Sequence, residues 1–406
     1  MIHDHVTACE AVRSWVKHPA ARSEPSHRFT PMTYWTRLKP ILSRFSITRV
    51  ADITGLDRIG IPVVQAVRPP ALSNAVSQGK GGSLEEAAIG AVLEAVETAS
   101  AETVPWKNLS HGSAREIFGE NSNVDFSHHL HPDIEKASWL DEILTWSTGI
   151  SLTTGAEHLI PSALVHTDFI PSSPHAKHPF RRSTTGLGAG PTLFHAILHS
   201  MQEIIERKAT GDAEMTHGFF ERKRFDPIPH SSEMTKQLLK TLNTLSILSG
   251  VYLCPSASKT YSVWAQLLDG TDSPLGLPLP ADGFACRSTI QSAIHAALME
   301  AVQTRASVIA ASRDDLTRTF YPRYPDNDLL AFERHRFAQD PPPSSDLPEI
   351  PVEEPGPDTW FDILSHGFAE TQFTPICVPL LSDERCPLHV VRILDVGNTN
   401  PAGCQA

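Results

Sequence analysis

Three stretches of the chain carry apolar residues on nearly every face when they are read at helical spacing. The first follows Gly81 and runs through Glu97, the second spans about residues 191–210, and the third about 288–310. Helices that are apolar nearly all round are expected to be buried. Glutamates inside such helices are therefore unusual and need an explanation.

Short runs of β-branched residues predict strands around these helices. The segment ITRVADITGLDRIGIPVVQAVRP, which starts at Ile47, predicts two strands around a Gly55–Gly60 connection, and a further short strand is predicted to end at Val76–Ser77. Near the C-terminus, ICVPLL and LHVVRIL predict strands that return to the core. The chain is therefore expected to contain both helices and strands.

Composition divides the chain into four predicted parts. Residues 1–40 are expected to form an N-terminal arm, of which residues 1–30, rich in His and Pro, are a loose arm or a short helix. Residues 41–338 are the main domain. The Pro-rich, acidic residues 339–358 predict an exposed linker or lid, and residues 359–406 predict strands that belong to the main domain.

Charge and cysteine content exclude several classes of function. The formal net charge is -12 and no run of lysines or arginines occurs, so nucleic acid is not expected as a partner. No apolar run approaches the roughly 18 residues of a membrane span, so no membrane partner is expected. The six cysteines form no C-x-x-C pair, which argues against a zinc site or a disulfide framework and favours a reduced cytoplasm.

The glutamates of the three apolar helices recur at matched spacing. Gly81 lies 13 residues before Glu94, and Gly190 lies 13 residues before Glu203. A second acid follows three residues after each leading glutamate, and the third helix repeats the pattern with an amide in second place; these positions are Glu97, Glu206, Glu300 and Gln303. Such repetition favours a shared site over three independent pairs of solvated glutamates, which is the common alternative.

Small residues share the helix face of each leading glutamate, because positions i, i+3 and i+7 lie on one side of a helix. They are Ala87 and Ala91, Ala196 and Ser200, and Ala293 and Ala297. We expect these stripes to line one cleft and to leave room for a ligand. Buried carboxylates need partners or a metal ion, and hard oxygen ligands suit Mg²⁺.

A Gly-Lys-Gly turn precedes the first acid helix and adds a phosphate-binding element. Lys80 and the backbone amides beside it, at the start of a helix, are expected to bind phosphate. The turn is not a Walker loop, because the expected glycine four residues before Gly79 is absent and no Ser or Thr follows Lys80. The sequence therefore predicts a Mg²⁺–nucleotide site of another type.

These motifs resemble those of the YcaO family, in the branch found beside TfuA proteins. The matching stretches, within about residues 45–315, are ITRVADITGLDRIGIPVVQAVRP, VSQGKG…AVLEAVE, LHSMQEIIERKA and ALMEAVQTRASVIAASRDDL. The resemblance implies an α+β YcaO-type fold, with three similar glutamate-bearing helices packed on β-sheets around a non-Walker ATP site. Residues 41–338 are then a YcaO-like ATP-binding catalytic domain.

The resemblance also assigns roles to the residues that match the family's motifs. It implies Mg²⁺ ligands at Glu94, Glu97, Glu203, Glu206 and Glu300, of which Glu94, Glu203 and Glu300 are catalytic. It implies nucleotide contacts at Ser77, Gly79, Lys80, Gly81, Arg207, Gln303 and Arg305, with Lys80, Arg207 and Arg305 on the phosphates.

The activity implied is ATP-dependent modification of backbone amides in a ribosomally made precursor peptide, as part of natural-product biosynthesis. The product is a thioamide or, by cyclodehydration, an azoline. The cofactors implied are ATP and Mg²⁺. The partners implied are the precursor peptide, a TfuA-like protein and a second copy of the chain in a homodimer, and the expected location is cytoplasmic.

Five positions depart from the family's usual residues and support an alternative. The family usually has Ser at Gly90, Arg at Thr98, Asn at Pro191, an acid at His195 and often Arg at Ala296. The alternative is a degenerate YcaO-like protein that binds the precursor peptide or a partner without ATP turnover.

Three further groups of reactive residues are expected to be structural. His128, His129 and His131 are expected to be a solvated loop cluster, with metal binding as the alternative. Cys254 and Cys286 are expected to be buried small hydrophobic residues. The segment Arg313, Asp314 and Asp315 matches the family's R-D-D stretch and is expected to form a network at a helix end, with a role in the ATP site as the alternative.

Overall fold

A computed structural model gives the arrangement of most of the chain. The residues that it describes are 5–18, 29–102, 104, 109–119, 124–135, 138–171, 178–271, 277, 279–313, 321, 326–341, 347, 353–383 and 386–398. Asp314, Asp315 and half of the predicted linker at residues 339–358 lie outside the described residues. The predictions for these residues therefore stay predictions.

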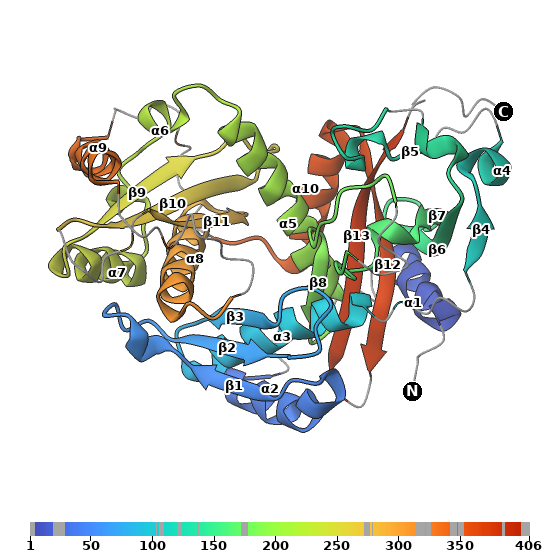
Figure 1. The fold of residues 1–406 in the computed structure, drawn as a ribbon, viewed down its shortest axis with the longest axis horizontal. Coiled ribbons are helices and arrows are strands. Elements are labelled where there is room, and N and C mark those ends of the chain that lie inside the picture. The colour runs from blue at the N-terminus through green and yellow to red at the C-terminus, as the bar shows by residue number, and fades with distance from the viewer. Residues whose placement is uncertain are drawn as a thin grey trace.

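The described residues form three sheets, in which all named strand pairs are antiparallel (Figure 1). One sheet contains β1 (Arg49–Asp52), β2 (Val63–Val67) and β3 (Val76–Lys80), and a second contains β9 (Ile247–Leu253), β10 (Tyr261–Asp269) and β11 (Ala281–Arg287). The third has the order β4-β6-β12-β13-β5, with β7 beside β6 and β8 beside β13. Its strands are β4 (Ser110–Gly112), β5 (Val124–Asp125), β6 (Leu144–Ser151), β7 (Glu157–Pro161), β8 (Leu187–Gly190), β12 (Phe373–Asp383) and β13 (Leu388–Asn398).

Three long helices each follow one strand and pack closely on it. They are α3 (Leu84–Glu102) after β3, α5 (Leu193–Glu214) after β8 and α8 (Ile290–Ala310) after β11. A glycine in each strand makes the close approach possible: a Cβ atom at Gly79, Gly188 or Gly283 would stand only 2.1–2.2 Å from atoms of the adjoining helix. The three strand–helix units are therefore built alike, although they belong to three different sheets.

Shorter helices complete the described part of the fold. The α-helices are α1 (His5–Lys17), α2 (Pro31–Leu38), α4 (Ala114–Phe118), α6 (Phe219–Arg222), α7 (Glu233–Thr244), α9 (Asn327–Ala338) and α10 (Pro357–Glu370). The 3-10 helices are η2 (Lys39–Phe45), η3 (Thr54–Leu56), η5 (Ser127–His129), η6 (Ser138–Asp141), η7 (Ser162–Leu164) and η9 (Ile228–His230).

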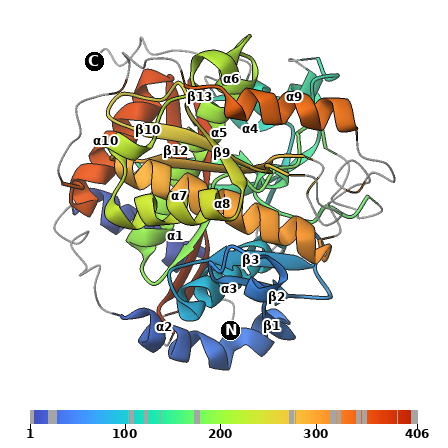
Figure 2. The same ribbon diagram turned by 90° about the vertical axis from the view of Figure 1, so that its left-hand side faces the viewer.

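The helix α8 lies between two of the sheets, β9–β11 and β1–β3, as both Figure 1 and Figure 2 show. Its apolar residues join those of β10 and β11 in one buried cluster, of which Ile294, Leu298 and Val302 are fully or almost fully buried. On the other side of the molecule α5 packs on β13 and α10. The glutamates lie in the middle turns of α3, α5 and α8.

The N-terminal residues 5–17 form the packed helix α1. Its Val12 and Trp15 are buried, and the Trp15 ring lies 5.4 Å from that of Phe194 in α5 and 5.0 Å from that of Phe361 in α10. This part of the predicted N-terminal arm is thus a helix held on the core by aromatic packing rather than a loose segment.

The strands and helices predicted from the hydrophobic pattern agree with the structure in type, with one error of position, but residues 359–370, predicted as part of a strand segment, belong to the helix α10. Strands form on both sides of the Gly55–Gly60 connection, and the two C-terminal runs form β12 and β13. The prediction that a strand ends at Val76–Ser77 is wrong: β3 begins at Val76 and continues to Lys80, because Gln78, Gly79 and Lys80 pair with β2. Gly79 and Lys80 therefore belong to β3, and Gly81 lies in the connection between β3 and α3.

No helix within the described residues is long and apolar enough to cross a membrane.

Candidate functional site

A cavity of about 700 Å³ lies where α3, α5 and α8 meet β3, β8 and β11. This volume is typical of sites for ligands as large as a nucleotide. Ten of the predicted site residues line it: Ser77, Gly79, Lys80, Glu94, Glu97, Glu203, Glu206, Arg207, Glu300 and Gln303. The structure therefore brings together the acids of all three helices, as their matched spacing predicts.

Backbone amides hold the leading glutamates of the first two helices. A carboxylate oxygen of Glu94 accepts a hydrogen bond from the amide of Gln78 in β3 at 2.8 Å. In the same way Glu203 accepts from the amide of Gly186, just before β8, at 2.9 Å. Each leading acid is thus fixed to the strand region of its own strand–helix unit.

The second acids reach the strand of the next unit. Glu97 of α3 accepts from the amide of Ala189 in β8 at 2.7 Å, and Glu206 of α5 accepts from the amide of Cys286 in β11 at 3.0 Å. The acid pairs therefore link the first unit to the second and the second to the third. These bonds hold one oxygen of each carboxylate and fix its position in the cavity wall.

Basic side chains stand beside the acids. Lys80 Nζ lies 3.2 Å from Glu300 Oε2, which connects β3 to α8 across the cavity. Arg207 Nε lies 3.7 Å from Glu203 Oε1, one turn along α5. Among the described residues the cavity is lined by five carboxylates and four Lys or Arg side chains, the other two being Arg287 and Arg313.

The cavity disfavours ionised glutamates when no cation is bound. Burial raises the pKa of Glu94, Glu203 and Glu206, and nearby carboxylates add to the effect. The pKa of Glu97 is raised well above its ordinary value by burial and by the charges of Glu203 and Glu94. A bound cation would reverse this effect, because an opposite charge stabilises the ionised form.

The donor set fits Mg²⁺ shared with a phosphate ligand. Carboxylate oxygens are the ligands that Mg²⁺ takes from proteins, in small number and together with phosphate oxygens. Within the described residues, no three of the five glutamates bring ligand atoms within 4.8 Å of one another. A single ion is therefore expected to bind one or two of these carboxylates and to complete its shell with other oxygens.

The expected phosphate site at the amides around Gly81 is wrong at two of its positions. The amide of Gly81 donates to the carbonyl of Pro62 at 3.2 Å, and that of Gly82 donates to Glu86 at 2.7 Å. Neither N–H is available to a phosphate, because β3 continues to Lys80 and α3 begins only at Leu84. Gly81 does not line the cavity, so Gly79 and Lys80 are the parts of the Gly-Lys-Gly motif that face it.

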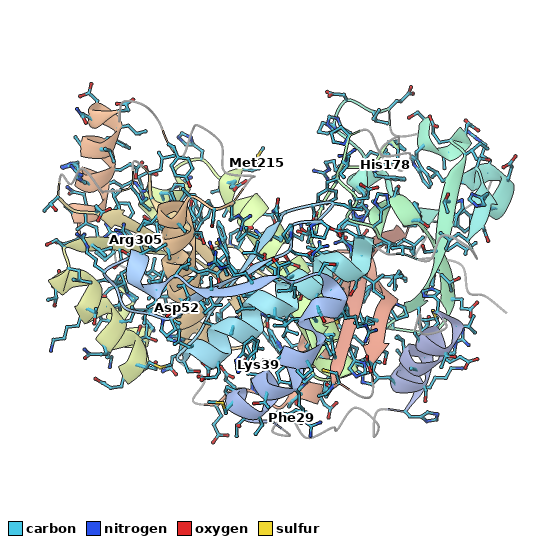
Figure 3. All side chains as sticks on the ribbon, turned by 60° about the horizontal axis from the view of Figure 1, so that its bottom comes forward. Phe29, Lys39, Asp52, His178, Met215 and Arg305 are labelled. Atoms are coloured by element: carbon cyan, nitrogen blue, oxygen red, sulfur yellow. The ribbon has the colours of Figure 1, made fainter. Side chains whose placement is uncertain are left out.

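Arg305 is also not brought to the cavity. Its guanidinium donates to Asp269 at 2.8 Å and to Asp57 at 3.1 Å, and its side chain is only 3% exposed. Figure 3 shows Arg305 on α8, on the side of the molecule opposite His178. Two aspartates occupy its donors, so the structure gives it a structural role in place of the expected contact with phosphate.

The small-residue stripes do not leave room for a ligand, contrary to the expectation from sequence. The six residues are fully buried: Ala87, Ala91, Ala196, Ser200, Ala293 and Ala297. The strand glycines Gly79 and Gly188 pack directly against the first two stripes. Small side chains are needed at these positions because the backbones of the strand and the helix come close together there. The glutamates lie further along each helix, where they face the cavity.

Three of the five unusual positions lie at the cavity. Gly90, Thr98 and Ala296 line it, whereas Pro191 and His195 do not. His195 Nδ1 lies 2.8 Å from the hydroxyl of Thr192, the residue that caps the start of α5. The difference from the family at His195 therefore affects the start of α5 and not the cavity lining.

Two titratable residues to which the sequence motifs give no role, His199 and Arg287, also line the cavity. His199 lies one turn before Glu203 on the same face of α5, so the helical period could have identified it. Arg287 lies 13 residues before Glu300, the spacing at which the first two helices have Gly81 and Gly190. The matched spacing of the three helices could therefore have identified Arg287 as a residue of the site.

The predictions for the cysteines and for the histidines have different outcomes. Burial raises the pKa of Cys254 and Cys286 to about 12, so the expectation that they are buried small residues rather than nucleophiles is confirmed. His131 is exposed, but His128 and His129 are packed against each other, with ring centroids 3.9 Å apart. The expectation of a solvated cluster is therefore wrong for two of the three histidines.

Comparison with known proteins gives a match over most of the chain. Residues 78–394 match the model of a family described as "YcaO cyclodehydratase, ATP-ad Mg2+-binding". An uncharacterised protein of Mycobacterium tuberculosis is 29% identical over 305 residues, which are 75% of this chain and 67% of that protein. An uncharacterised protein in the tfuA 3′ region of Rhizobium leguminosarum bv. trifolii is 29% identical over 72% of this chain and 70% of its own length.

Solved structures share the fold. YcaO from Methanopyrus kandleri, bound with AMPPCP and Mg²⁺, superposes with a TM-score of 0.67 at 19% identity, over 92% of this chain and 96% of its own. A heterocyclase in complex with substrate and cofactor has the same TM-score at 16% identity, over 92% of this chain and 53% of its own. The Escherichia coli microcin synthetase McbBCD complex contains a chain with a TM-score of 0.53 at 12% identity, over 84% of this chain and 85% of its own.

Proposed function

The chain belongs to the YcaO family, whose cofactors are ATP and Mg²⁺, and from this we propose that it modifies backbone amides of a ribosomally made precursor peptide at the expense of ATP. The observation that carries the proposal is the cavity in which Glu94, Glu97, Glu203, Glu206 and Glu300 converge with Lys80 and Arg207. A cavity with this donor set suits a triphosphate and its metal ion.

The reaction that we propose transfers a phosphoryl group to an amide oxygen. A nucleophile adds to a peptide carbonyl, the resulting oxygen takes the γ-phosphoryl group of ATP, and loss of phosphate completes the exchange. Positioning and charge stabilisation dominate the catalysis of phosphoryl transfer. This chemistry needs no nucleophile from the protein, so the inert, buried Cys254 and Cys286 agree with it.

The cavity residues have three tasks in this proposal. The backbone bonds to Glu94, Glu97, Glu203 and Glu206 keep four carboxylates in place before any ligand binds. Lys80 and Arg207 bind phosphate oxygens and orient the triphosphate. Mg²⁺, when it is bound to these carboxylates, neutralises phosphate charge and polarises the transferred group.

The ion pair between Lys80 and Glu300 must change when a triphosphate binds. Lys80 Nζ is 3.2 Å from Glu300 Oε2, and both side chains are about one-quarter exposed, at 25% and 27%. A phosphate that takes Lys80 as its partner leaves Glu300 for Mg²⁺. In the ligand-free protein, the ion pair between Lys80 and Glu300 holds both side chains at the cavity.

The product is a thioamide if the nucleophile is external sulfide and an azoline if it is a neighbouring Cys, Ser or Thr of the peptide. The relative from the tfuA 3′ region supports a TfuA-like partner and with it the thioamide product. The heterocyclase and the microcin synthetase among the structural neighbours support cyclodehydration. A homodimer stays part of the proposal.

The test is peptide-dependent phosphate release, measured with the precursor peptide encoded beside the gene and with the TfuA-like protein where one is encoded. Glu94→Gln and Glu203→Gln should abolish it, because each removes a carboxylate charge from the cavity. Glu85→Gln on α3 and Glu214→Gln on α5 are matched controls, since neither residue lines the cavity. Mass spectrometry of the peptide separates loss of water from exchange of oxygen for sulfur.

Unchanged turnover in both cavity variants would refute the proposal. A second function is favoured by Gly90, Thr98 and Ala296, which line the cavity where the family usually has other residues. In that case the protein binds the peptide or a partner and does not consume ATP. Peptide binding by a folded wild-type protein, without phosphate release under any of the conditions above, would support this second function.

A further inference from the structure

Two histidines and an aspartate converge at the end of β13, away from the ATP cavity. Strand β5 pairs with β13 at Gly397 and Asn398, and the 3-10 helix η5 follows β5 directly. The turn is fixed by the amide of Ser127, which donates to Asp125 at 2.7 Å. This local geometry brings His128 and His129 over Asp395 of β13.

The three side chains have the spacing of metal ligands. His128 Nε2 lies 3.5 Å from Asp395 Oδ2, and His129 Nε2 lies 3.4 Å from Asp395 Oδ1. All three ligand atoms lie within 4.8 Å of one another, and no other such group of three occurs in the described part of the chain. In a tetrahedral zinc site with bonds of 2.0–2.1 Å, ligand atoms stand roughly 3.3 Å apart.

Hydrogen bonds among these residues account for only part of the cluster, since His129 Nε2 lies 3.1 Å from the backbone carbonyl oxygen of Asp395 but His128 Nε2 has no such partner. His128 Nε2 is buried and makes no hydrogen bond, because 3.5 Å to the carboxylate is longer than such a bond. A metal ion would replace the contact of His129 Nε2 with the Asp395 carbonyl. It would also satisfy the buried Nε2 of His128.

We propose that His128, His129 and Asp395 bind one Zn²⁺ ion. Two imidazole nitrogens and one carboxylate oxygen suit zinc and similar divalent transition metals, whereas Mg²⁺ prefers oxygen ligands only. None of the three residues lines the ATP cavity, so this site is separate from the glutamate cluster. Three protein ligands leave a fourth position for water.

The surroundings give the ion a structural role and a place for its water. Asp395 also lines a smaller cavity of about 210 Å³, together with Phe373, Lys208 and Asp212. The ring of Phe373 lies 4.6 Å from that of His128 and limits its movement. The ion therefore joins η5 to the end of β13 in the seven-stranded sheet, and its fourth position is filled from this cavity.

Cobalt substitution tests the site directly. The protein, freed of any affinity tag and of metal, is titrated with Co²⁺ in excess Mg²⁺, so that cavity carboxylates do not compete. One equivalent of Co²⁺ should produce the visible absorption of tetrahedral coordination, and Zn²⁺ should remove it. His128→Gln and Asp395→Asn should abolish the absorption, and His131→Gln should keep it, because His131 belongs to the same loop but pairs with Asp133.

Thermal unfolding gives an independent readout. Zn²⁺ should raise the Tm of the wild type and of His131→Gln and leave the Tm of Asp395→Asn unchanged. Circular dichroism confirms that each variant is folded before it is titrated. No cobalt absorption in the wild type, equal loss in His131→Gln, or a retained signal in Asp395→Asn would each overturn the proposal.

Discussion

The Arg305 cluster and the glutamate cavity both place buried acids beside α8, but only the first balances them within the protein. Asp57 and Asp269 are 5% and 2% exposed, and Arg305 binds both of them. Arg58 adds a second cation on Asp269 at 2.7 Å. Two aspartates thus meet two arginines, and the cluster is complete without a ligand.

In the cavity, backbone amides hold four of the five acids, while Arg207 forms an ion pair with Glu203 and Lys80 forms one with Glu300. Glu94, Glu97, Glu203 and Glu206 each accept one N–H, and their pKa values are raised by burial. An amide dipole fixes a carboxylate but does not cancel its charge. The same residue types thus stabilise the fold where they are paired, and under the proposed function they would hold a cation where they are not.

The largest expected effect is the loss of stability in Arg305→Met. The change leaves Asp57 and Asp269 buried without their main partner, and breaking a buried pair in this way typically costs about 3–5 kcal/mol. Urea unfolding measures it. Arg58→Met is the matched control, since its side chain is 42% exposed and surface pairs contribute about 0–1 kcal/mol. A stable Arg305→Met protein with weakened ATP binding would restore the phosphate role that the sequence predicts.

Glu97→Gln should have the opposite effect on stability. It removes a charge that burial, Glu203 and Glu94 all disfavour, so the ligand-free protein should unfold at the same or a higher temperature. Affinity for Mg²⁺–ATP, measured by calorimetry, should fall at least about 10–100-fold, the cost of disturbing even an outer ligand of a metal site. Glu214→Gln on the exposed face of α5 is the control. Equal loss of stability in Glu97→Gln and Arg305→Met would remove the distinction between the two regions.

The pH dependence of stability should report on the cavity acids. Burial raises the pKa of Glu206 from 4.5 to about 7, so between these values the folded state binds more protons than the unfolded state. The free energy of unfolding of the metal-free protein should therefore fall as the pH rises through this range, by at most about 1.4 kcal/mol per pH unit for one proton. Denaturant titrations across the range measure the slope.

Glu206→Gln makes this prediction specific. The variant should reduce the slope by the contribution of one titrating group, since glutamine does not titrate, and the slope that remains belongs to Glu94, Glu97 and Glu203, whose pKa values are also raised. Excess Mg²⁺–ATP should reduce the slope in the wild type, and Glu214→Gln should keep it. A slope in Glu206→Gln equal to that of the wild type would show that Glu206 does not contribute.

Sequence reasoning succeeded where the signal was local to one helix. The glutamates repeat at i and i+3 on apolar helices, and this period alone places each pair on one face. The same geometry explains the error at Arg305. It lies five residues after Glu300, about 140° around α8, whereas Arg207 lies four residues after Glu203 and nearly above it. A helical projection would have separated the two arginines.

The remaining errors concern contacts between segments that are far apart in the sequence. The small-residue stripes were correctly identified, but nothing in their spacing tells that Gly79 and Gly188 pack on them. His129 and Asp395 are 266 residues apart and meet because β5 pairs with β13. Such contacts depend on the order of strands in the sheets, which the hydrophobic pattern leaves open.

The smallest expected effect is at Gly90, where the resemblance to the family expects serine. A Cβ atom there would stand 3.3 Å from Gly79 Cα, so a shift of a few tenths of an ångström is needed, while a side chain in a helix interior gains about 0.5–1 kcal/mol over glycine. The two effects offset each other, and Gly90→Ser should change the free energy of unfolding by less than about 1 kcal/mol. Because Gly90 lines the cavity, the added hydroxyl should tighten Mg²⁺–ATP binding by the worth of one hydrogen bond, about 0.5–1.5 kcal/mol.

Gly79→Ala is the matched contrast to Gly90→Ser, since the two glycines face each other where β3 meets α3. A Cβ atom at Gly79 would stand 2.1 Å from the carbonyl oxygen of Ala87 and 2.3 Å from the amide of Ala91, both of them backbone atoms that move only with the helix. Overpacking of this kind costs at least about 1–3 kcal/mol. Calorimetry and urea unfolding on both variants measure the two effects. A Gly90→Ser protein as unstable as Gly79→Ala would mean that this chain has adapted its strand–helix contact to glycine, and the departure from the family would then be structural rather than a loss of nucleotide contacts.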